Sequence, residues 1–232
     1  MEVSDRRDIP TVTALRQRGN VKAASAAAAA LSRSGLYLLL ARALAFPQPE
    51  FHRETISGRL RQRLAEALEG LPYRLALSPS RDWRPVSDYE TFQSEYIRLF
   101  EVGPRGHALC PLYSGHYGRD RLRTMEELVR FYNYFGLRIT PGLMPDHVTV
   151  ELEFMHYLAH QEAQARQTGS DTESYLRAQK DFLERHLNGW WPLALAAAQR
   201  HRPQRFYRSL MALVLRFLAA ERRHLASALR SG

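Results

Sequence analysis

Hydrophobic positions recur at intervals of three and four residues along almost the whole chain. This spacing places them on one face of an α-helix, and no convincing alternation of the kind that predicts β-strands competes with it. Proline and glycine divide the pattern into about eight helices. We expect them near residues 23–45, 50–69, 87–100, 124–135, 147–167 and 170–188, with a short alanine-rich helix from Trp190 and a last one at 203–229.

Two segments are predicted to lie inside this assembly. In residues 147–167, apolar side chains cover most of the helix circumference, so this helix should lie near the middle of the bundle. A second stripe consists of aromatic residues at helical spacing, and such stripes are most often core. It contains Tyr89, Phe92, Tyr96 and Phe100. The pattern as a whole predicts an all-α fold, a single-domain helical bundle.

Several helix starts carry capping signals, in which a hydroxyl and a carboxylate three residues later satisfy the first turn. The pairs are Ser87 with Glu90, Thr124 with Glu127, and Ser170 with Glu173. Asp146, just after Pro145, is a further plausible N-cap for the central helix.

Residues 1–20 show no hydrophobic periodicity and many charges, so we expect a flexible N-terminal tail, followed by one helical domain over residues 21–232.

With 45% hydrophobic and 25% charged residues, the composition is that of a globular protein. Cys110 is the single cysteine and cannot form an internal disulfide, which fits a cytoplasmic location. No uninterrupted apolar run approaches the roughly 18 residues of a membrane span, so no stable membrane insertion is expected.

The chain has 33 basic and 24 acidic residues, a formal net charge of +9. A basic excess raises the alternative of a helical nucleic-acid-binding protein. However, the arginines are spread along the chain without a block of five or six, and we interpret them mainly as solvated helix faces. The preferred hypothesis therefore includes no nucleic acid as a partner.

Catalytic motifs are missing: the sequence has no glycine-rich phosphate loop, dinucleotide fingerprint, nucleophile elbow or paired CxxC. We assign no catalytic residue, no cofactor and no metal ligand, and expect a binding protein that is not an enzyme.

Two Glu-x-x-His pairs, Glu153 with His156 and Glu221 with His224, are half of a di-iron site. A metal-dependent bundle oxidase is the less favoured alternative, because two further inward carboxylates are not identifiable.

Five segments together resemble a known family, the cytoplasmic TorD/DmsD/NarJ-type chaperones of molybdenum redox enzymes. They are EYIRLFEVG (95–103), CPLYSGHYG (110–118), VRFYNYFGL (129–137), PDHVTVELEFMHYLA (145–159) and FLERHLNGWWP (182–192), which span about residues 88–195. Within the family, the chain looks most like the chaperones that serve the type II branch of the dimethyl sulfoxide reductase family. One departure is Ser114-Gly115 after Tyr113, where the wider family often has Glu-Ser.

The resemblance implies a TorD-like bundle that binds the catalytic, molybdopterin-binding subunit of its client, often through a twin-arginine signal peptide. Such a chaperone holds the subunit until the cofactor is inserted and then permits export, and it turns over no substrate. A monomer or a dimer is compatible with the sequence, which does not identify the client.

A twin-arginine leader carries positive charge followed by an apolar segment, so its receptor needs carboxylates beside an apolar groove. Asp146 and Glu151 are the best acidic candidates, with Glu95, Glu101, Glu126 and Glu127 in adjoining helices. Asp146 and His147 match the family's Asp-His pair, which is associated there with ligand binding, and His147 and Glu151 share a helical face.

The long loop between Val102 and Asp120 adds aromatic candidates, because long loops in compact domains are more often functional than idle. The predicted client-binding set is Asp146, His147, Glu151, Tyr113, Tyr117 and Pro111. For Asp146, capping and client contact both remain open.

Overall fold

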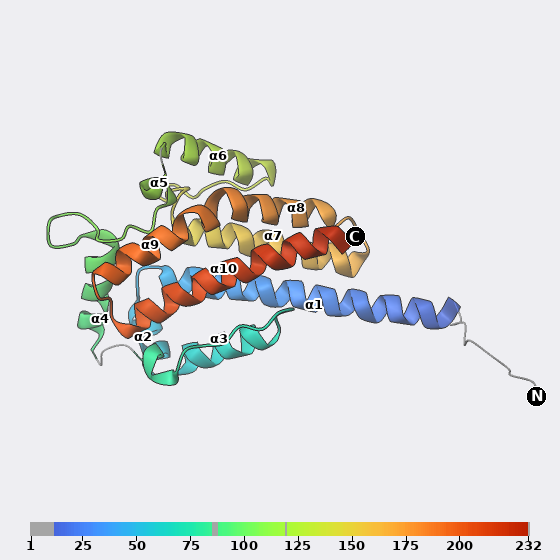
Figure 1. Ribbon diagram of the computed structural model, residues 1–232, viewed down its shortest axis with the longest axis horizontal. Coiled ribbons are helices and arrows are strands. Elements are labelled where there is room, and N and C mark those ends of the chain that lie inside the picture. Colours follow the sequence, from blue (N-terminus) through green and yellow to red (C-terminus); the bar gives the residue numbers. More distant parts are fainter. Residues whose placement is uncertain (1–11, 85–87, 119, 232) are drawn as a thin grey trace, which may run out of the picture.

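The computed structural model describes residues 12–84, 88–118 and 120–231, and these residues form ten α-helices (Figure 1). They are α1 (Val12–Leu44), α2 (Pro49–Ile56), α3 (Arg59–Glu69), α4 (Tyr89–Tyr96), α5 (Ser114–Tyr117), α6 (Arg121–Tyr134), α7 (Val148–Thr168), α8 (Glu173–Phe182), α9 (Asn188–Arg200) and α10 (Arg205–Ser231). The predicted all-α class is confirmed. The two helices beyond the expected eight arise because Gly58, at φ 81°, separates α2 from α3, and because the long loop contains the single turn α5.

The helix α7 lies in the middle, as its apolar circumference predicts. Figure 1 shows α1, α7, α8 and α10 along the long axis, with α6 at one outer edge and α3 at the opposite one. The most extensive packing is between α1 and α7, while α10 packs on α8 and α9. Leu152, Met155 and Leu158 of α7 are fully buried. Burial of such side chains is the main favourable contribution to folding, about 25 cal/mol for each Å² of apolar surface.

Aromatic residues fill one end of this core. Phe92, Tyr96 and Phe100 are buried, and the ring of Phe92 stacks on Tyr207 of α10 with centroids 5.2 Å apart. Tyr89 is only half-buried, and its hydroxyl donates to the Pro47 carbonyl at 3.0 Å. The aromatic stripe is therefore core at three of its four positions.

The other end of the bundle encloses an ionic cluster that the sequence pattern does not reveal. The side chain of Arg33 in α1 is completely buried and donates to Glu162 in α7 and to Glu221 in α10, each at 2.7 Å. It also donates to Gln179 in α8 at 2.5 Å. Burial favours the neutral acid, but Arg33 holds the pKa of Glu162 below its ordinary value. One guanidinium thus links four helices.

The first helix differs from the expectation at its start. It begins at Val12 and not near Ala23, so part of the expected tail 1–20 is helical, while residues 1–11 lie outside the described part of the chain. By length and composition, Ala24–Leu44 could also cross a membrane, contrary to the expectation that no segment reaches that length. Half of its most apolar window is buried inside the protein, and a core helix has the same composition. Its packing along α7 accounts for this apolar character.

The predicted capping boxes are wrong where the structure describes them, because a nearby aspartate takes the role. Asp120 accepts from the backbone N–H of Arg123 at 3.0 Å, which places Thr124 inside α6. Asp171 accepts from the N–H of Glu173 at 2.9 Å. At α4 the cap is Asp88, and Ser87 lies outside the described residues. A carboxylate is the stronger acceptor for an N–H at a helix start, where the macrodipole favours negative charge.

The helical path also continues where a break was expected. Between α8 and α9 the chain makes a π-helical turn, Leu183–Leu187, so the predicted end near Asn188 does not occur. Leu183, Leu187 and Trp191 keep helical spacing through this junction and are all fully buried. Continuous burial therefore outweighs the helix-breaking signals.

Candidate client-binding site

The long loop crosses the start of α7 and joins two predicted segments. The N–H of Val148 donates to the carbonyl of Leu112, and the N–H of Ser114 donates to the carbonyl of Asp146, both at 2.8 Å. These bonds form an isolated antiparallel bridge between Tyr113 and His147. Their rings meet edge to face with centroids 4.9 Å apart. The loop candidate Tyr113 and the Asp-His pair therefore belong to one site.

His147, and not Asp146, caps α7. Its Nδ1 accepts from the backbone N–H of Thr149 at 3.3 Å and lies 2.7 Å from the Thr149 hydroxyl. Burial lowers the pKa of His147 to about 4, so the imidazole is neutral at neutral pH and available as an acceptor. The cap interpretation of Asp146 is thus wrong, which leaves the Asp146 carboxylate without a backbone partner at the helix start.

Asp146 and Glu151 form a pair of fully buried carboxyl groups. Among the described residues, neither oxygen of Asp146 has a hydrogen-bond partner. The indole N–H of Trp190 in α9 donates to Oε2 of Glu151 at 3.0 Å, while Oε1 is unpartnered. Burial raises the pKa of Glu151 to about 8, with a contribution in the same direction from Asp146; the nearby Ser114 hydroxyl and the Trp190 indole act in the opposite direction.

Two hydroxyl groups complete this cluster of buried side chains, which we call the carboxylate pocket and define by Ser114, Tyr117, Asp146, Glu151 and Trp190. The Ser114 and Tyr117 hydroxyls are buried; within the described chain the Tyr117 hydroxyl makes no hydrogen bond, while the Ser114 hydroxyl lies near Glu151. The ring of Tyr117 stacks on Trp190 with centroids 5.5 Å apart. Buried polar groups are usually bonded, so a cluster of unsatisfied ones is typical of a site that a ligand or ordered water completes.

Gly115, where the sequence departs from the wider family, is required by this geometry. A Cβ atom there would stand 2.5 Å from Cγ of Arg121 and 2.8 Å from Oδ2 of Asp146. Both distances are shorter than real Cβ contacts, so a side chain at this position would displace Arg121 or the carboxylate. Glycine therefore allows Arg121 to approach Asp146 closely.

The remaining predicted residues lie outside the pocket or are otherwise engaged. Pro111 is half-buried in the same loop, next to Leu112. Glu95 accepts two bonds from Arg98 and one from the N–H of Gln204. The other acidic candidates are surface groups: Glu101 is exposed, Glu126 pairs with Arg130, and Glu127 pairs with Arg123 and Arg185.

An apolar cleft lies beside the pocket. It has a volume of about 230 Å³ and is lined by Leu137, Ile139, Leu143, Val150 and Phe154, with Tyr132, Arg138, Thr140, Glu153 and Tyr157. Tyr132 connects the two sites, since it lines the cleft and donates its hydroxyl to the carbonyl of Pro145 at 2.9 Å, directly before Asp146. Carboxylates and an apolar surface are therefore neighbours, the combination expected from the sequence.

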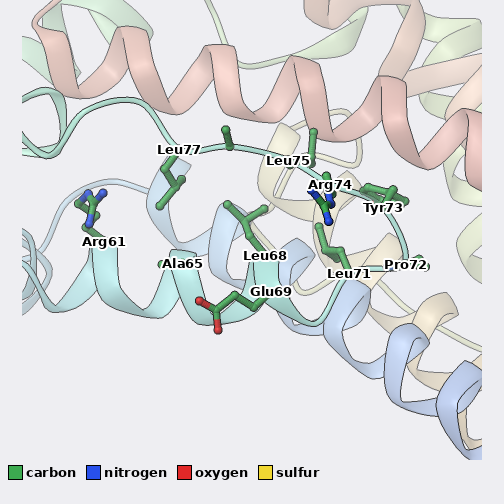
Figure 2. A pocket seen from close by; sticks show the side chains of 11 residues that line it. Arg61, Ala65, Leu68, Glu69, Leu71, Pro72, Tyr73, Arg74, Leu75 and Leu77 are labelled. Carbon is green, nitrogen blue, oxygen red and sulfur yellow. The ribbon is translucent and has the colours of Figure 1, made fainter.

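A larger groove lies elsewhere, between α3 and the extended segment that follows it. Its volume is about 860 Å³, and Figure 2 shows Leu68, Leu71 and Leu77 pointing into the space between the helix and the segment. None of the predicted site residues lines it. The candidate site is thus assigned by its chemistry and not by cavity size.

Neither the Glu-x-x-His pairs nor Cys110 forms a reactive site in the described part of the chain. Glu221 is held by Arg33 and Tyr73, and His156 contacts Ser34 through Nδ1 at 2.8 Å, so these members of the two pairs have separate partners. Within the described ranges, no group of three His, Cys, Asp or Glu residues could hold a metal ion. Cys110 is buried, and its burial raises the pKa of the thiol to about 12, which disfavours a reactive thiolate.

Comparison with known proteins decides the family. Residues 54–196 match the model of the "Nitrate reductase delta subunit" family. The chain belongs to this family. The "Perchlorate reductase assembly chaperone protein" of Dechloromonas aromatica is 35% identical over 198 residues, which cover 82% of this chain and 88% of that protein. The predicted resemblance to TorD-type maturation chaperones is confirmed.

Two further relatives agree. The dimethyl sulfide dehydrogenase assembly chaperone of Rhodovulum sulfidophilum is 36% identical over 76% of this chain and 73% of its own. The selenate reductase assembly chaperone of Thauera selenatis is 40% identical over 114 residues, which cover 47% of this chain and 58% of that protein. These family members are named as assembly chaperones and not as enzymes, which supports the non-enzymatic prediction. A redox enzyme maturation protein from Archaeoglobus fulgidus aligns over 84% of this chain and 93% of its own, with 18% identity and a TM-score of 0.43.

The residues that sequence reasoning missed are Ser114, Gly115, Arg121 and Trp190. Trp190 stands 39 positions after Glu151 in the sequence, so no local spacing connects the two. Arg121 is one of many arginines and has no distinguishing neighbour in sequence. For Ser114 and Gly115 the available signal was the departure from the family pattern directly after Tyr113.

Proposed function

We propose that the chain is a cytoplasmic, system-specific chaperone for the molybdopterin-containing catalytic subunit of an oxidoreductase of the type II dimethyl sulfoxide reductase family. The observation that carries this proposal is the similarity to the perchlorate reductase assembly chaperone over 82% of the chain. That share is too large to reflect one shared motif. The named relatives serve perchlorate reductase, selenate reductase and dimethyl sulfide dehydrogenase, so relatedness supports the class of client and not a particular one.

The proposed contact surface is the carboxylate pocket together with the apolar cleft. A twin-arginine leader offers guanidinium groups followed by an apolar segment, and the two neighbouring sites match these in chemistry. Tyr113 and His147 stand half-buried at the rim, where aromatic side chains favour protein contacts. Binding here would keep the leader from the export machinery while the cofactor is inserted into the subunit.

The direct test is co-purification of the tagged chain from its native host, with mass spectrometry of the bound protein and metal and nucleic-acid analysis of the same sample. We expect a molybdopterin-type catalytic subunit that still carries its leader. Stoichiometric iron or salt-sensitive nucleic acid in its place would support one of the alternatives and overturn the chaperone proposal. The control for variants of the proposed contact surface is Glu173→Ala with Arg177→Ala. It removes an exposed ion pair of α8 away from that surface, and it should still recover the catalytic subunit.

A further inference from the structure

Arg121, the first residue of α6, stands at the mouth of the carboxylate pocket but does not satisfy it. Its Nε lies 3.5 Å from Oδ2 of Asp146, and the two do not form a hydrogen bond. Its side chain stays 55% exposed, whereas that of Asp146 is fully buried. The guanidinium carbon lies 6.0 Å from the centre of the Tyr113 ring, at the outer range of a cation–π contact. Arg121 is therefore a loosely held cation that reaches the pocket from solvent.

Arg33 shows how an arginine is held when it is a permanent part of the structure. It is fully buried and makes hydrogen bonds of 2.5 to 3.0 Å to Glu162, Gln179 and Glu221. The contacts of Arg121 with Asp146 and Tyr113 are longer and include no such bond. The contrast indicates that Arg121 can leave its position without breaking a bonded network.

The unsatisfied atoms of the carboxylate pocket match one kind of ligand. Both oxygens of Asp146 can accept hydrogen bonds, and so can the Ser114 and Tyr117 hydroxyls. A guanidinium presents five N–H donors in a plane and binds carboxylates through two parallel bonds, while an ammonium group has three donors at one point. The pocket therefore fits an arginine side chain better than a lysine.

We propose that the carboxylate pocket is a receptor for an arginine side chain of the client, and that Arg121 occupies its mouth in the free chaperone until the client's arginine replaces it. This inference rests on the proposed function, because it specifies which group of the client is recognised. Gly115 makes the exchange possible, since a Cβ atom there would collide with both Arg121 and Asp146. In the free protein the internal arginine lies 3.5 Å from the buried Asp146 carboxyl group, where an unpaired charge would be costly.

Competition of this kind lowers the apparent affinity for the client in proportion to the time that Arg121 occupies the pocket. If the pocket is accessible for about a tenth of the time, the apparent affinity is about tenfold below the intrinsic one. Removing Arg121 should therefore strengthen binding, although it removes a contact from the free protein. Removing an arginine with a purely structural role would not strengthen client binding.

The test measures binding of two synthetic peptides to the full chain by isothermal titration calorimetry. One peptide carries two adjacent arginines followed by an apolar segment, and the other carries citrulline, a neutral isostere, in place of both arginines. We expect Arg121→Gln to bind the arginine peptide at least about fivefold more tightly than the unmodified chain. The matched control is Arg123→Gln, which removes the same charge from the same end of α6, where Arg123 pairs with Glu127. It should change the affinity less than about twofold.

The exchange is overturned if Arg121→Gln and Arg123→Gln bind the arginine peptide equally, or if the citrulline peptide binds as well as the arginine peptide. It is also overturned if no variant binds the arginine peptide. The chaperone proposal is judged separately by recovery of the catalytic subunit in co-purification, so it can stand when the exchange fails. Should Arg121→Gln not fold, Arg121→Lys keeps the charge but loses the planar donors, and we expect it also to bind the peptide more tightly than the unmodified chain.

Discussion

The indole N–H of Trp190 donates to Oε2 of Glu151 at 3.0 Å and so ties α9 to the middle of the bundle, at a carboxyl group with no access to water. Asp146 lies beside the Glu151 carboxyl group. The buried side chain of Tyr132 in α6 and that of Ser114 in α5 are also near it. This environment raises the pKa of Glu151 from its ordinary 4.5 to about 8, mainly through burial.

A pH dependence of stability follows from Glu151. In the unfolded chain it loses its proton near pH 4.5, whereas in the folded chain it keeps it until about pH 8. Between these values Glu151 binds more protons in the folded state, so its contribution to the free energy of unfolding should fall as pH rises, by up to about 1.4 kcal/mol per pH unit, and level off above pH 8. Urea unfolding of the unmodified chain and of Glu151→Gln across this range measures the effect.

Glu151→Gln should remove this slope and be more stable than the unmodified chain above pH 8, since an amide can still accept from Trp190. His147 and His186 act in the opposite direction below about pH 6.5, because burial lowers the pKa of each to about 4 while the unfolded imidazoles still bind a proton there. The contribution of Glu151 is therefore the difference between the two chains. Glu126→Gln, a change to an exposed residue of α6, is the control. Parallel pH curves for the unmodified chain and Glu151→Gln would show that the group is ionised in the folded protein.

Replacing Asp146 and His147 together with Ala should weaken client binding more than it lowers stability. Asp146 makes no side-chain hydrogen bond among the described residues, so its loss breaks none, and the lost His147 cap should cost about 1 kcal/mol. Affinity for the recovered catalytic subunit and the urea midpoint should be measured on the same preparations. A large drop in stability with unchanged affinity per folded molecule would assign both residues a structural role.

The sequence predicts the fold well because hydrophobic spacing is a local signal. The central position of α7 follows from apolar residues that cover most of its circumference, among them Val148, Leu152 and Met155, all of which are fully buried. Boundaries are less predictable, because an aspartate a few positions away can take over a cap, as Asp120 does for α6.

The site is only partly predictable. Tyr113 and His147 could be proposed from motifs, and the structure brings them together. By contrast, the contact between Glu151 and Trp190 depends on tertiary packing between distant segments. The burial of Asp146 is equally invisible to sequence, since an aspartate at a helix start is ordinarily exposed and capping.

Gly115 and Gly35 should respond in opposite ways to substitution by alanine. At Gly115 the new Cβ meets Arg121 and Asp146, so we expect a loss of roughly 1 to 3 kcal/mol and weaker binding of the arginine peptide. At Gly35, inside α1, a Cβ meets nothing within 4 Å, and alanine should stabilise the helix by about 0.5 to 1 kcal/mol without affecting binding. Urea unfolding and peptide titration of both variants check this. Equal tolerance at the two positions would contradict the close packing around Gly115.

Arg33 provides the sharpest test of the core. Arg33→Met leaves the buried carboxylates of Glu162 and Glu221 without their common cation, and we expect it to lower the free energy of unfolding by about 3 to 5 kcal/mol. Combining Arg33→Met with Glu162→Leu and Glu221→Leu should recover most of this loss, because apolar groups need no charged partner. Chemical denaturation of the single and triple variants gives both values.

Arg177→Met is the control, since its ion pair with Glu173 lies on the surface and its removal should leave the unfolding midpoint unchanged. If the triple variant is no more stable than Arg33→Met, the loss comes from packing of the arginine stem and not from stranded charges. Recovery in the triple variant would show that the four helices joined by Arg33 are held by apolar packing, with the ionic cluster fixing their relative positions.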